Sequence, residues 1–380
     1  MATQPLKSNP PILFLPNELI ADILSRLRVK YLMQMKCVSK SWNTLISDSM
    51  FIKMHLNQSS LNPQFSLIYS QNNDHSFVSF PVSLLWENRS INISHDPYYQ
   101  LNDKSCEEIV GSCNGLVCLA GHSLNEITRC KERWLRFWNP ATRAISNKLG
   151  AYYYKFKYYK FTFGYDKSTE TYKVVVFGSN LKEKNIVKIL SLGDNVWRSI
   201  HGIHAIPLQF YFDHEYDGVH LSCTINWMAF QSVFGGDDIN EYVIISLDLS
   251  TDTFTQLMPP ENYDNDGYVP NICVLMDSLC FSYEKESEIF IWQMTKFGDE
   301  KSWSHFLKFS YHNVGIDYKF GHPFILHISE DGDTLLLANN QQDSAILYNW
   351  RNNIAKKTRI NNKICWFSIR NYVESLVPTC

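Results

Sequence analysis

The chain has 380 residues, of which 45% are hydrophobic and 14% aromatic, so it can bury a large core and lacks the composition of a disordered protein. Its formal charge of −3 gives no basic excess for binding nucleic acid. No apolar run approaches the length of a membrane span or of a signal peptide, so we expect neither.

The N-terminal residues predict a cluster of short amphipathic helices. Apolar residues recur from Leu15 to Leu27 at a spacing near 3.6, which is typical of one helix face. Pro16 suits the start of this helix. Two further short apolar stripes follow, and Ser47-Asp48 offers an N-cap for a last turn. A unit of about forty residues buries little apolar surface, so it commonly needs a partner.

The same region resembles the F-box, a helical module, over roughly residues 12–56. The matching positions are Leu15, Pro16, Glu18, Leu19, Ile23, Leu24, Arg26 and Leu27, followed by Cys37, Val38, Lys40, Ser41, Trp42, Leu45, Ile46, Ser47, Asp48 and Phe51. One departure is Arg28, where the plant F-box pattern usually has Pro. Loss of that Pro should loosen the helix boundary slightly without removing the apolar face. The plain alternative is an N-terminal helical hairpin that packs only on its own protein.

The resemblance implies a set of partners. An F-box binds a Skp-type adaptor, and through it a cullin and a RING protein. The residues expected to form the adaptor-facing apolar surface and its support are Leu15, Pro16, Leu19, Ile23, Leu24, Leu27, Leu32, Val38 and Trp42. Some of them must belong to the core of the module itself, and the sequence does not separate the two sets.

From about residue 65 the pattern changes to short β-branched and aromatic runs separated by turns, which predicts an all-β region. A polar turn follows an apolar strand five times, at spacings of 55, 54, 50 and 51 residues, with markers at Asn139, Asp194, Asp248, Gly298 and Asn349. A near-constant period indicates a repeat, and about four strands per repeat favour a β-propeller. Residues 57–110 can supply a divergent further unit, so we expect about six blades, with the strand 364–369 helping to close the ring.

This region also resembles the F-box-associated domain of plants, an irregular kelch-like propeller, over roughly residues 105–377. The matching motifs are Gly111–Leu119, Trp138–Arg143, Phe163–Asp166, Tyr172–Val175 and Tyr372–Leu376. We expect Gly111 and Gly115 to permit a tight turn and Asn139 or Thr142 to bond nearby backbone.

The predicted fold class is therefore α+β and multidomain, with a small helical F-box ahead of an all-β propeller. The expected division is a flexible N-terminus at 1–11, the F-box at 12–56, a connector and divergent first blade at 57–104, and the propeller domain at 105–377.

Ten cysteines occur, but most lie in apolar strand-like runs and none forms a C-x-x-C pair. The pattern predicts reduced, buried thiols and not a zinc site or a disulfide framework. Such thiols are typical of a protein of the cytoplasm, the nucleus or both.

Candidate chemistry is sparse. Gly111–Gly115 superficially fits a nucleophile elbow with Cys113 as nucleophile, but a strand and not a helix is predicted to follow, and no partner histidine is indicated. The cluster of His201, His204, His214 and His220 lacks a recognisable metal-ligand spacing, and the acidic loop 261–267 fits a calcium loop only loosely. We therefore expect no catalytic residue, no metal and no cofactor.

One unusual run, 152–161, alternates aromatic and basic residues. A sticky binding edge and an ordinary strand with one face in the core explain it equally well.

The two resemblances together imply the substrate-recognition subunit of an SCF-type (Skp–cullin–F-box) ubiquitin ligase, without catalytic activity of its own. The propeller would then bind an unknown target protein through loops, of which 150–160, 211–218, 233–241 and 261–269 are candidates by length and polarity. Two alternatives stay open: a non-degradative F-box interaction protein, or a propeller that binds a glycan without a cullin. A propeller enzyme is a further rival, and the sequence offers no convergent acids or nucleophile for it.

Overall fold

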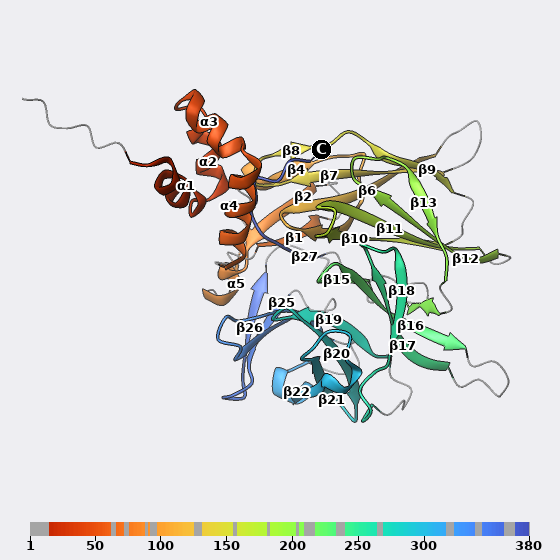
Figure 1. Cartoon of the computed structure of the whole chain (residues 1–380). Helices are drawn as coiled ribbons and strands as arrows, with labels where there is room; N and C mark the ends of the chain where they lie inside the picture. The colour runs from red at the N-terminus through yellow and green to blue at the C-terminus, as the bar shows by residue number, and fades with distance from the viewer. Residues whose placement is uncertain are drawn as a thin grey trace, which may run out of the picture.

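A computed structural model of the chain describes residues 15–61, 66–71, 76–87, 90–91, 97–124, 131–154, 158–180, 183–202, 205–208, 217–232, 240–263, 269–316, 323–338, 344–360 and 369–379. A group of helices at the N-terminal end lies against one side of a strand-rich body (Figure 1). The predicted fold class, a small helical module ahead of an all-β propeller, is confirmed. No helix within the described ranges is both long and apolar enough to cross a membrane.

The module consists of α1 (Asn17–Ser25), α2 (Val29–Met35), α3 (Lys40–Ser47) and α4 (Ser49–Leu61). The Ser39 hydroxyl accepts the Trp42 N–H at 3.2 Å and so caps α3. The Asp48 carboxylate accepts the N–H of Met50 at 2.9 Å and of Phe51 at 3.3 Å, which satisfies donors at the start of α4. Asp48 is therefore the predicted cap, but the helix that it begins has 13 residues and is far longer than one turn.

The described strands form six sheets of four or five strands each, which we number as blades in chain order. The first contains β1 (Ser66–Gln71), β2 (Ser76–Pro81), β4 (Gln100–Asn102) and β27 (Arg370–Tyr372); the second, β5 (Glu108–Cys113), β6 (Leu116–Leu124), β7 (Lys131–Asn139), β8 (Ala144–Ile145) and β9 (Leu149–Tyr154); the third, β10 (Tyr158–Asp166), β11 (Thr171–Asn180), β12 (Glu183–Ser191) and β13 (Trp197–Ile200). The fourth contains β14 (Ile206–Pro207), β15 (Val219–Leu221), β16 (Thr224–Ser232), β17 (Asn240–Asp248) and β18 (Thr253–Leu257); the fifth, β19 (Asn271–Leu275), β20 (Ser278–Lys285), β21 (Glu288–Met294) and β22 (Trp303–Ser310); the sixth, β23 (Phe324–Ile328), β24 (Thr334–Ala338), β25 (Ser344–Asn349), β26 (Ile354–Ile360) and β3 (Ser90–Ile91). Short helices lie between some of these strands, namely α5 (Ser83–Glu87), η1 (Pro97–Tyr99), η3 (Glu300–Ser302) and α6 (Tyr311–Val314).

The ring is closed by the C-terminal strand. β27 pairs with β1 at the other end of the chain's strand-rich region, and the Asn371 side-chain amide donates to the Leu326 carbonyl of β23 at 3.4 Å. The first blade thus combines the two ends of this region and meets the sixth blade. The closing strand expected at 364–369 falls mostly outside the described residues, and the described one is Arg370–Tyr372.

The repeat found in the sequence corresponds to one position in each of the second to sixth blades. All five marker residues lie at the end of, or shortly after, the third strand of their blade, namely β7, β12, β17, β21 and β25. The Asp248 carboxylate accepts the Ser250 N–H at 2.7 Å, and the Asn349 side-chain oxygen accepts the Asn352 N–H at 2.9 Å. A short polar side chain therefore holds the turn into the outer strand, which explains why Asn and Asp recur there.

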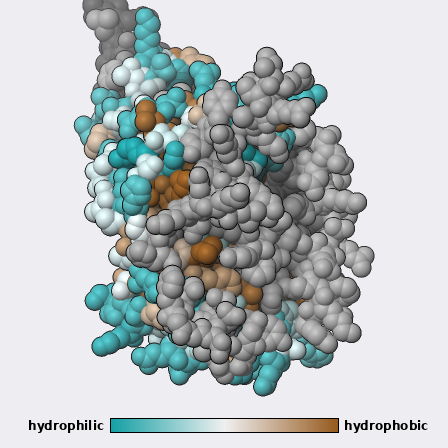
Figure 2. Space-filling view, turned by 90° about the vertical axis from the view of Figure 1, so that its right-hand side faces the viewer, coloured by the Kyte–Doolittle hydropathy of each residue, from teal (hydrophilic) through white to brown (hydrophobic). Residues whose placement is uncertain are grey.

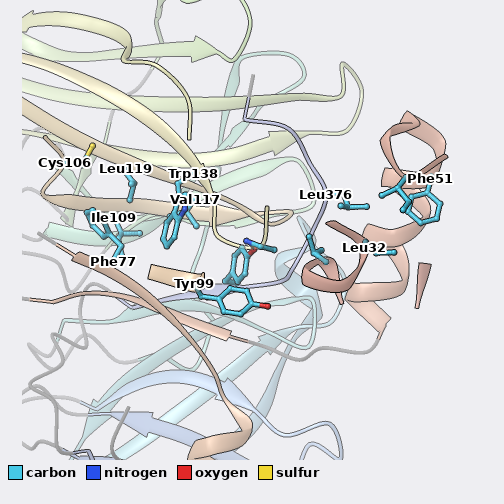
Figure 3. Packing of buried hydrophobic residues seen from close by; sticks show 14 of the residues in the cluster. Leu32, Phe51, Phe77, Tyr99, Cys106, Ile109, Val117, Leu119, Trp138 and Leu376 are labelled. Carbon is cyan, nitrogen blue, oxygen red and sulfur yellow. Dashed lines mark hydrogen bonds between the residues drawn. The ribbon is translucent and has the colours of Figure 1, made fainter. Parts of the chain in front are cut away.

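Apolar side chains pack between neighbouring blades. Between the third and fourth, for example, the Phe177 and Trp227 rings meet at a centroid distance of 4.7 Å. The cluster between the first and second blades differs because it also contains residues of the helical module. In Figure 3, Leu32 and Phe51 of the helices lie beside Leu376, and the cluster continues through the propeller. The helices and the propeller thus share one core.

The predicted motifs meet where the ring closes. The Asn139 amide donates to the carbonyls of Ser375 at 3.0 Å and Val377 at 2.8 Å, while its oxygen accepts the Ala141 N–H at 3.0 Å. Gly115 has a φ of +79°, and a Cβ there would lie 2.1 Å from the Ser375 hydroxyl, so no larger residue fits. The expectation that Gly111 shares this turn is wrong, because it lies within β5.

Candidate interaction surfaces

The first surface is an apolar row on α1 that the protein leaves uncovered. Leu15, Leu19 and Ile23 are 56%, 51% and 52% exposed. Leu19 and Ile23 are four residues apart and share one face of α1, and Leu15 lies two residues before the helix begins. Pro16 is exposed beside them. We call Leu15, Leu19 and Ile23 the α1 row.

The structure divides the predicted adaptor residues into two sets. Leu24 and Leu32 are buried in the core shared with the propeller, and Leu27 and Trp42 are partly buried against it. Val38 is 67% exposed in the loop before α3. Sequence reasoning missed two exposed residues of the module, Tyr31 and Met50. Neither fits the helical spacing that identified the others, so the sequence carried no signal for them.

A second feature lies where the module meets the propeller, around the Glu374 carboxylate. One oxygen accepts from the Arg28 guanidinium at 2.7 Å and from the Tyr99 hydroxyl at 3.0 Å. The other accepts the backbone N–H of Val29, at the start of α2, at 3.2 Å. Burial acts to lower the pKa of Arg28, but the hydrogen bond and charge of Glu374 outweigh it and raise that pKa. Arg28 therefore stays cationic. We call Glu374 and its three donors the Glu374 node.

A third feature is a cleft of about 1330 Å³ between α4 and the propeller. Ile52 and Leu56 of α4 form one wall. The turns that join the first and second strands of several blades form the opposite wall, together with Val377 near the C-terminus. At its rim Lys53 of α4 forms an ion pair with Glu170 at 2.6 Å.

The cleft lies at one end of the blades. In an antiparallel blade, the turn between the first and second strands and the turn between the third and fourth strands lie at the same end. This is the end that carries α4 (Figure 1). Figure 2 views the molecule from the opposite side, where the described residues are largely hydrophilic along the lower edge. Parts of all four predicted target loops lie outside the described part of the chain, namely residues 155–157, 211–216, 233–239 and 264–268.

On the floor of the cleft the structure brings Cys113 and His220 together, with 3.7 Å between Sγ and Nδ1. Sequence reasoning indicated no partner histidine for Cys113, because the two residues lie 107 positions apart in the chain. Burial raises the pKa of the Cys113 thiol to about 12 and lowers that of His220. The other His220 nitrogen lies 3.0 Å from the Tyr165 carbonyl oxygen. A thiol kept protonated is the opposite of what a cysteine nucleophile needs, so this pair has the character of a packed core contact.

The other candidate sites are not assembled in the described part of the chain. Among those residues no group of three or more His, Cys, Asp or Glu side chains is placed to hold a metal ion. His201 is exposed, and His204 and His214 fall outside the described ranges. In the aromatic-basic run, Phe161 is buried, and the guanidinium of Arg133 lies 3.8 Å from the Tyr159 ring centroid. These two residues fit an ordinary strand that has one face in the core.

Comparisons with known proteins cover both parts of the chain. The F-box domain profile matches residues 12–54, and that of the F-box associated beta propeller domain matches residues 68–379. An F-box/kelch-repeat protein of Arabidopsis thaliana is 28% identical over 308 residues, covering 77% of this chain and 79% of that protein. A second F-box protein of Arabidopsis thaliana is 26% identical over 300 residues, covering 76% and 89%. Among solved structures, a nidogen/laminin complex chain aligns with a TM-score of 0.45 and 8% identity, covering 82% of this chain and 99% of that one.

Proposed function

Because the chain belongs to the plant F-box proteins that carry an F-box-associated β-propeller, we propose that it is the substrate-recognition subunit of an SCF-type ubiquitin ligase. In this role the helical module binds a Skp-type adaptor, which joins a cullin and a RING protein. The propeller binds the target protein. The free thiols of Cys106, Cys118 and Cys280, all buried, support a location in the cytoplasm or nucleus.

The observation that carries the proposal is the α1 row. The helix has a buried side at Leu24, so it is already anchored to its own protein. Two large apolar side chains of α1, Leu19 and Ile23, and that of Leu15 just before the helix are nevertheless left exposed. Contiguous exposed apolar residues mark protein interaction sites. Fully burying an exposed Leu or Ile side chain contributes about 1.5–3 kcal/mol. Because these three are already about half covered, each can contribute roughly half of that, and the three together can still support an interface.

In this proposal the protein contributes proximity and performs no covalent chemistry. A target held on the propeller stays at high effective concentration near the ubiquitin-loaded enzyme that the scaffold carries. The raised pKa of the Cys113 thiol, which lies half-buried beside His220, does not favour a cysteine nucleophile and so supports this proposal.

We place the target segment in the cleft beside α4. Its volume of about 1330 Å³ exceeds that of typical small-molecule sites, which is about 300–1,000 Å³, and suits an extended peptide. Leu56 and Val377 offer apolar walls, and the exposed Lys167 and Asp277 at the lining offer charges of both signs. A segment with an apolar side chain between charged ones fits this chemistry.

The test is co-expression with a plant Skp-type adaptor, followed by size-exclusion chromatography. We expect a one-to-one complex with the wild type and none with the double variant Leu15→Ala, Pro16→Ala. Val196→Ala, which truncates an exposed apolar residue of the propeller, is the control and should leave the complex intact. Undiminished co-elution of the double variant, or no complex of the wild type with several adaptors, would contradict the adaptor role. Adding cullin to the complex then separates a ligase subunit from a non-degradative F-box protein.

A further inference from the structure

The Glu374 node joins parts of the chain that are far apart in sequence. Glu374 follows the ring-closing strand β27, Tyr99 ends the helix η1, and Arg28 and Val29 begin α2. Val29 and Glu374 lie 345 positions apart in the chain. A single carboxylate therefore contacts the module, the first blade and the C-terminal segment together.

These contacts differ in kind from the apolar packing around them. Leu32 and Phe51 pack against Leu376 and hold the two domains together, but hydrophobic contact has no preferred direction. Hydrogen bonds have preferred distances and angles. Two donors of the module, Arg28 and Val29, approach different oxygens of a carboxylate that also accepts from Tyr99 of the propeller. Rotation of the module against the propeller therefore strains or breaks at least one of the two bonds that cross the boundary.

The node also replaces a missing helix cap. The first N–H groups of a helix have no partner within it, and the N-cap residue of α2, Arg28, makes no side-chain cap. Glu374 accepts the Val29 N–H in its place, and its negative charge lies at the positive end of α2. The start of α2 is thus completed by a residue of the propeller.

Arg28 takes part without distorting the backbone. Its φ of −63° and ψ of 144° are values that Pro also adopts, so the boundary expected to loosen is kept. In place of a Pro ring the chain has a guanidinium that reaches Glu374 and lies 5.8 Å from the Tyr99 ring centroid.

A second ion pair between module and propeller, Lys53–Glu170, is placed differently. Both of its side chains are half exposed, Lys53 at 50% and Glu170 at 58%, whereas in the Glu374 node Arg28 is 48% exposed but its acceptor Glu374 is only 12% exposed. Water and salt weaken exposed pairs, so Lys53–Glu170 adds little restraint.

We infer that Glu374 is a positioning residue that fixes the angle between the F-box and the propeller. The purpose of this restraint rests on the proposed function: with the angle fixed, the α1 row and the cleft keep a constant separation, and so would the adaptor and the target. A positioning residue of this kind affects where the target is presented and not how tightly the adaptor binds.

The experiment measures that separation in the full chain. Spectroscopic labels on noncanonical amino acids replace two exposed residues, Asn43 on α3 and Asn352 in the turn after β25, and pulsed dipolar spectroscopy gives the distance distribution between them. We expect one narrow distribution for the wild type, with or without adaptor. Glu374→Gln should broaden it or add a second distance, and adaptor binding should be unchanged.

Three further variants keep the inference falsifiable. Arg28→Pro retains the Val29–Glu374 bond and should broaden the distribution less than Glu374→Gln, as should Tyr99→Phe. The control Glu170→Gln removes the exposed carboxylate at the same domain boundary and should leave the distribution narrow. A narrow, unshifted distribution for Glu374→Gln would overturn the inference, as would a lowered unfolding temperature with no broadening, because that pattern indicates stabilisation without positioning. Failure of the wild type to bind any adaptor would instead contradict the proposed function and leave the distance measurement valid.

Discussion

The helical module and the propeller handle their apolar residues differently. Each blade interface of the propeller covers its large side chains on both sides, as Phe177 and Trp227 show. The module is covered on one side only: Leu24 and Leu32 lie in the core shared with the propeller, and the α1 row stays in water. The difference teaches that one side of the module is committed to its own chain and the other is free for a partner.

The largest expected effect lies in the propeller. Trp227 is fully buried, and its indole N–H donates to the Thr162 hydroxyl at 3.1 Å. Trp227→Ala opens a cavity and leaves that hydroxyl without its donor, so we expect a loss of about 3–5 kcal/mol of unfolding free energy. Urea denaturation followed by circular dichroism measures it. A loss below about 1 kcal/mol would show that the blade interface is not the close-packed core described.

The second prediction uses two leucines of the same helix. Leu24→Ala should cost about 2–5 kcal/mol of stability, because the side chain is buried, whereas Leu19→Ala should change stability by less than about 0.5 kcal/mol. For adaptor binding the order is reversed: Leu19→Ala should weaken it more than Leu24→Ala, as measured by calorimetry on variants shown to be folded. If Leu19→Ala destabilised the protein as much as Leu24→Ala, the division of α1 into a committed side and a free side would be wrong.

This division also marks the limit of what the sequence predicts. The 3.6 periodicity located Leu15, Leu19, Leu24 and Leu27 on apolar helix faces, and all four look alike at that level. Which of them is buried depends on where the propeller packs against α1. That placement is set by Leu376 and its neighbours, at the other end of the chain.

The propeller was more predictable because its repeat is local. The period near fifty residues arises from turns in which Asn139 and Asp248 accept the backbone N–H two residues further on. Each turn is therefore determined by a few consecutive residues. The Glu374 node and the Cys113–His220 contact were not predictable. Each joins residues more than a hundred positions apart, and no periodic pattern reports such contacts.

The third prediction concerns the stability of the fold at low pH. Burial disfavours the ionised form of Asp166, but hydrogen bonds from Ser168, Thr169 and Ser250 outweigh it and hold its pKa well below the usual range. Because this pKa is lower in the folded state than the value of about 3.9 in the unfolded chain, the stability it contributes is present above about pH 4 and is lost as the pH falls further.

The variant Asp166→Asn tests whether the ionised Asp166 carboxylate contributes to stability in this way. The variant should be less stable than the wild type near neutral pH, and the gap should narrow below about pH 4, as followed by denaturation at a series of pH values. A gap that stays constant down to pH 3 would show that Asp166 has no depressed pKa in the folded protein.

The smallest effect belongs to the Lys53–Glu170 pair at the rim of the cleft. Both side chains are about half exposed, so Lys53→Met should leave the denaturation midpoint unchanged within error, at low and high salt alike. A clearly lowered denaturation midpoint at low salt, with no change at high salt, would mean that this pair also holds the module on the propeller. The Glu374 node would then not act alone.

The central claim is that the F-box keeps one side for its own propeller and offers the other to an adaptor. Hydrogen–deuterium exchange of the full chain, with and without a Skp-type adaptor, tests it most directly. The account predicts that the adaptor slows exchange in peptides covering α1 and the Val38 loop and leaves the peptides around Glu374 unchanged. The account would be contradicted if the adaptor slowed exchange in peptides of the propeller and left the exchange rate in α1 unchanged.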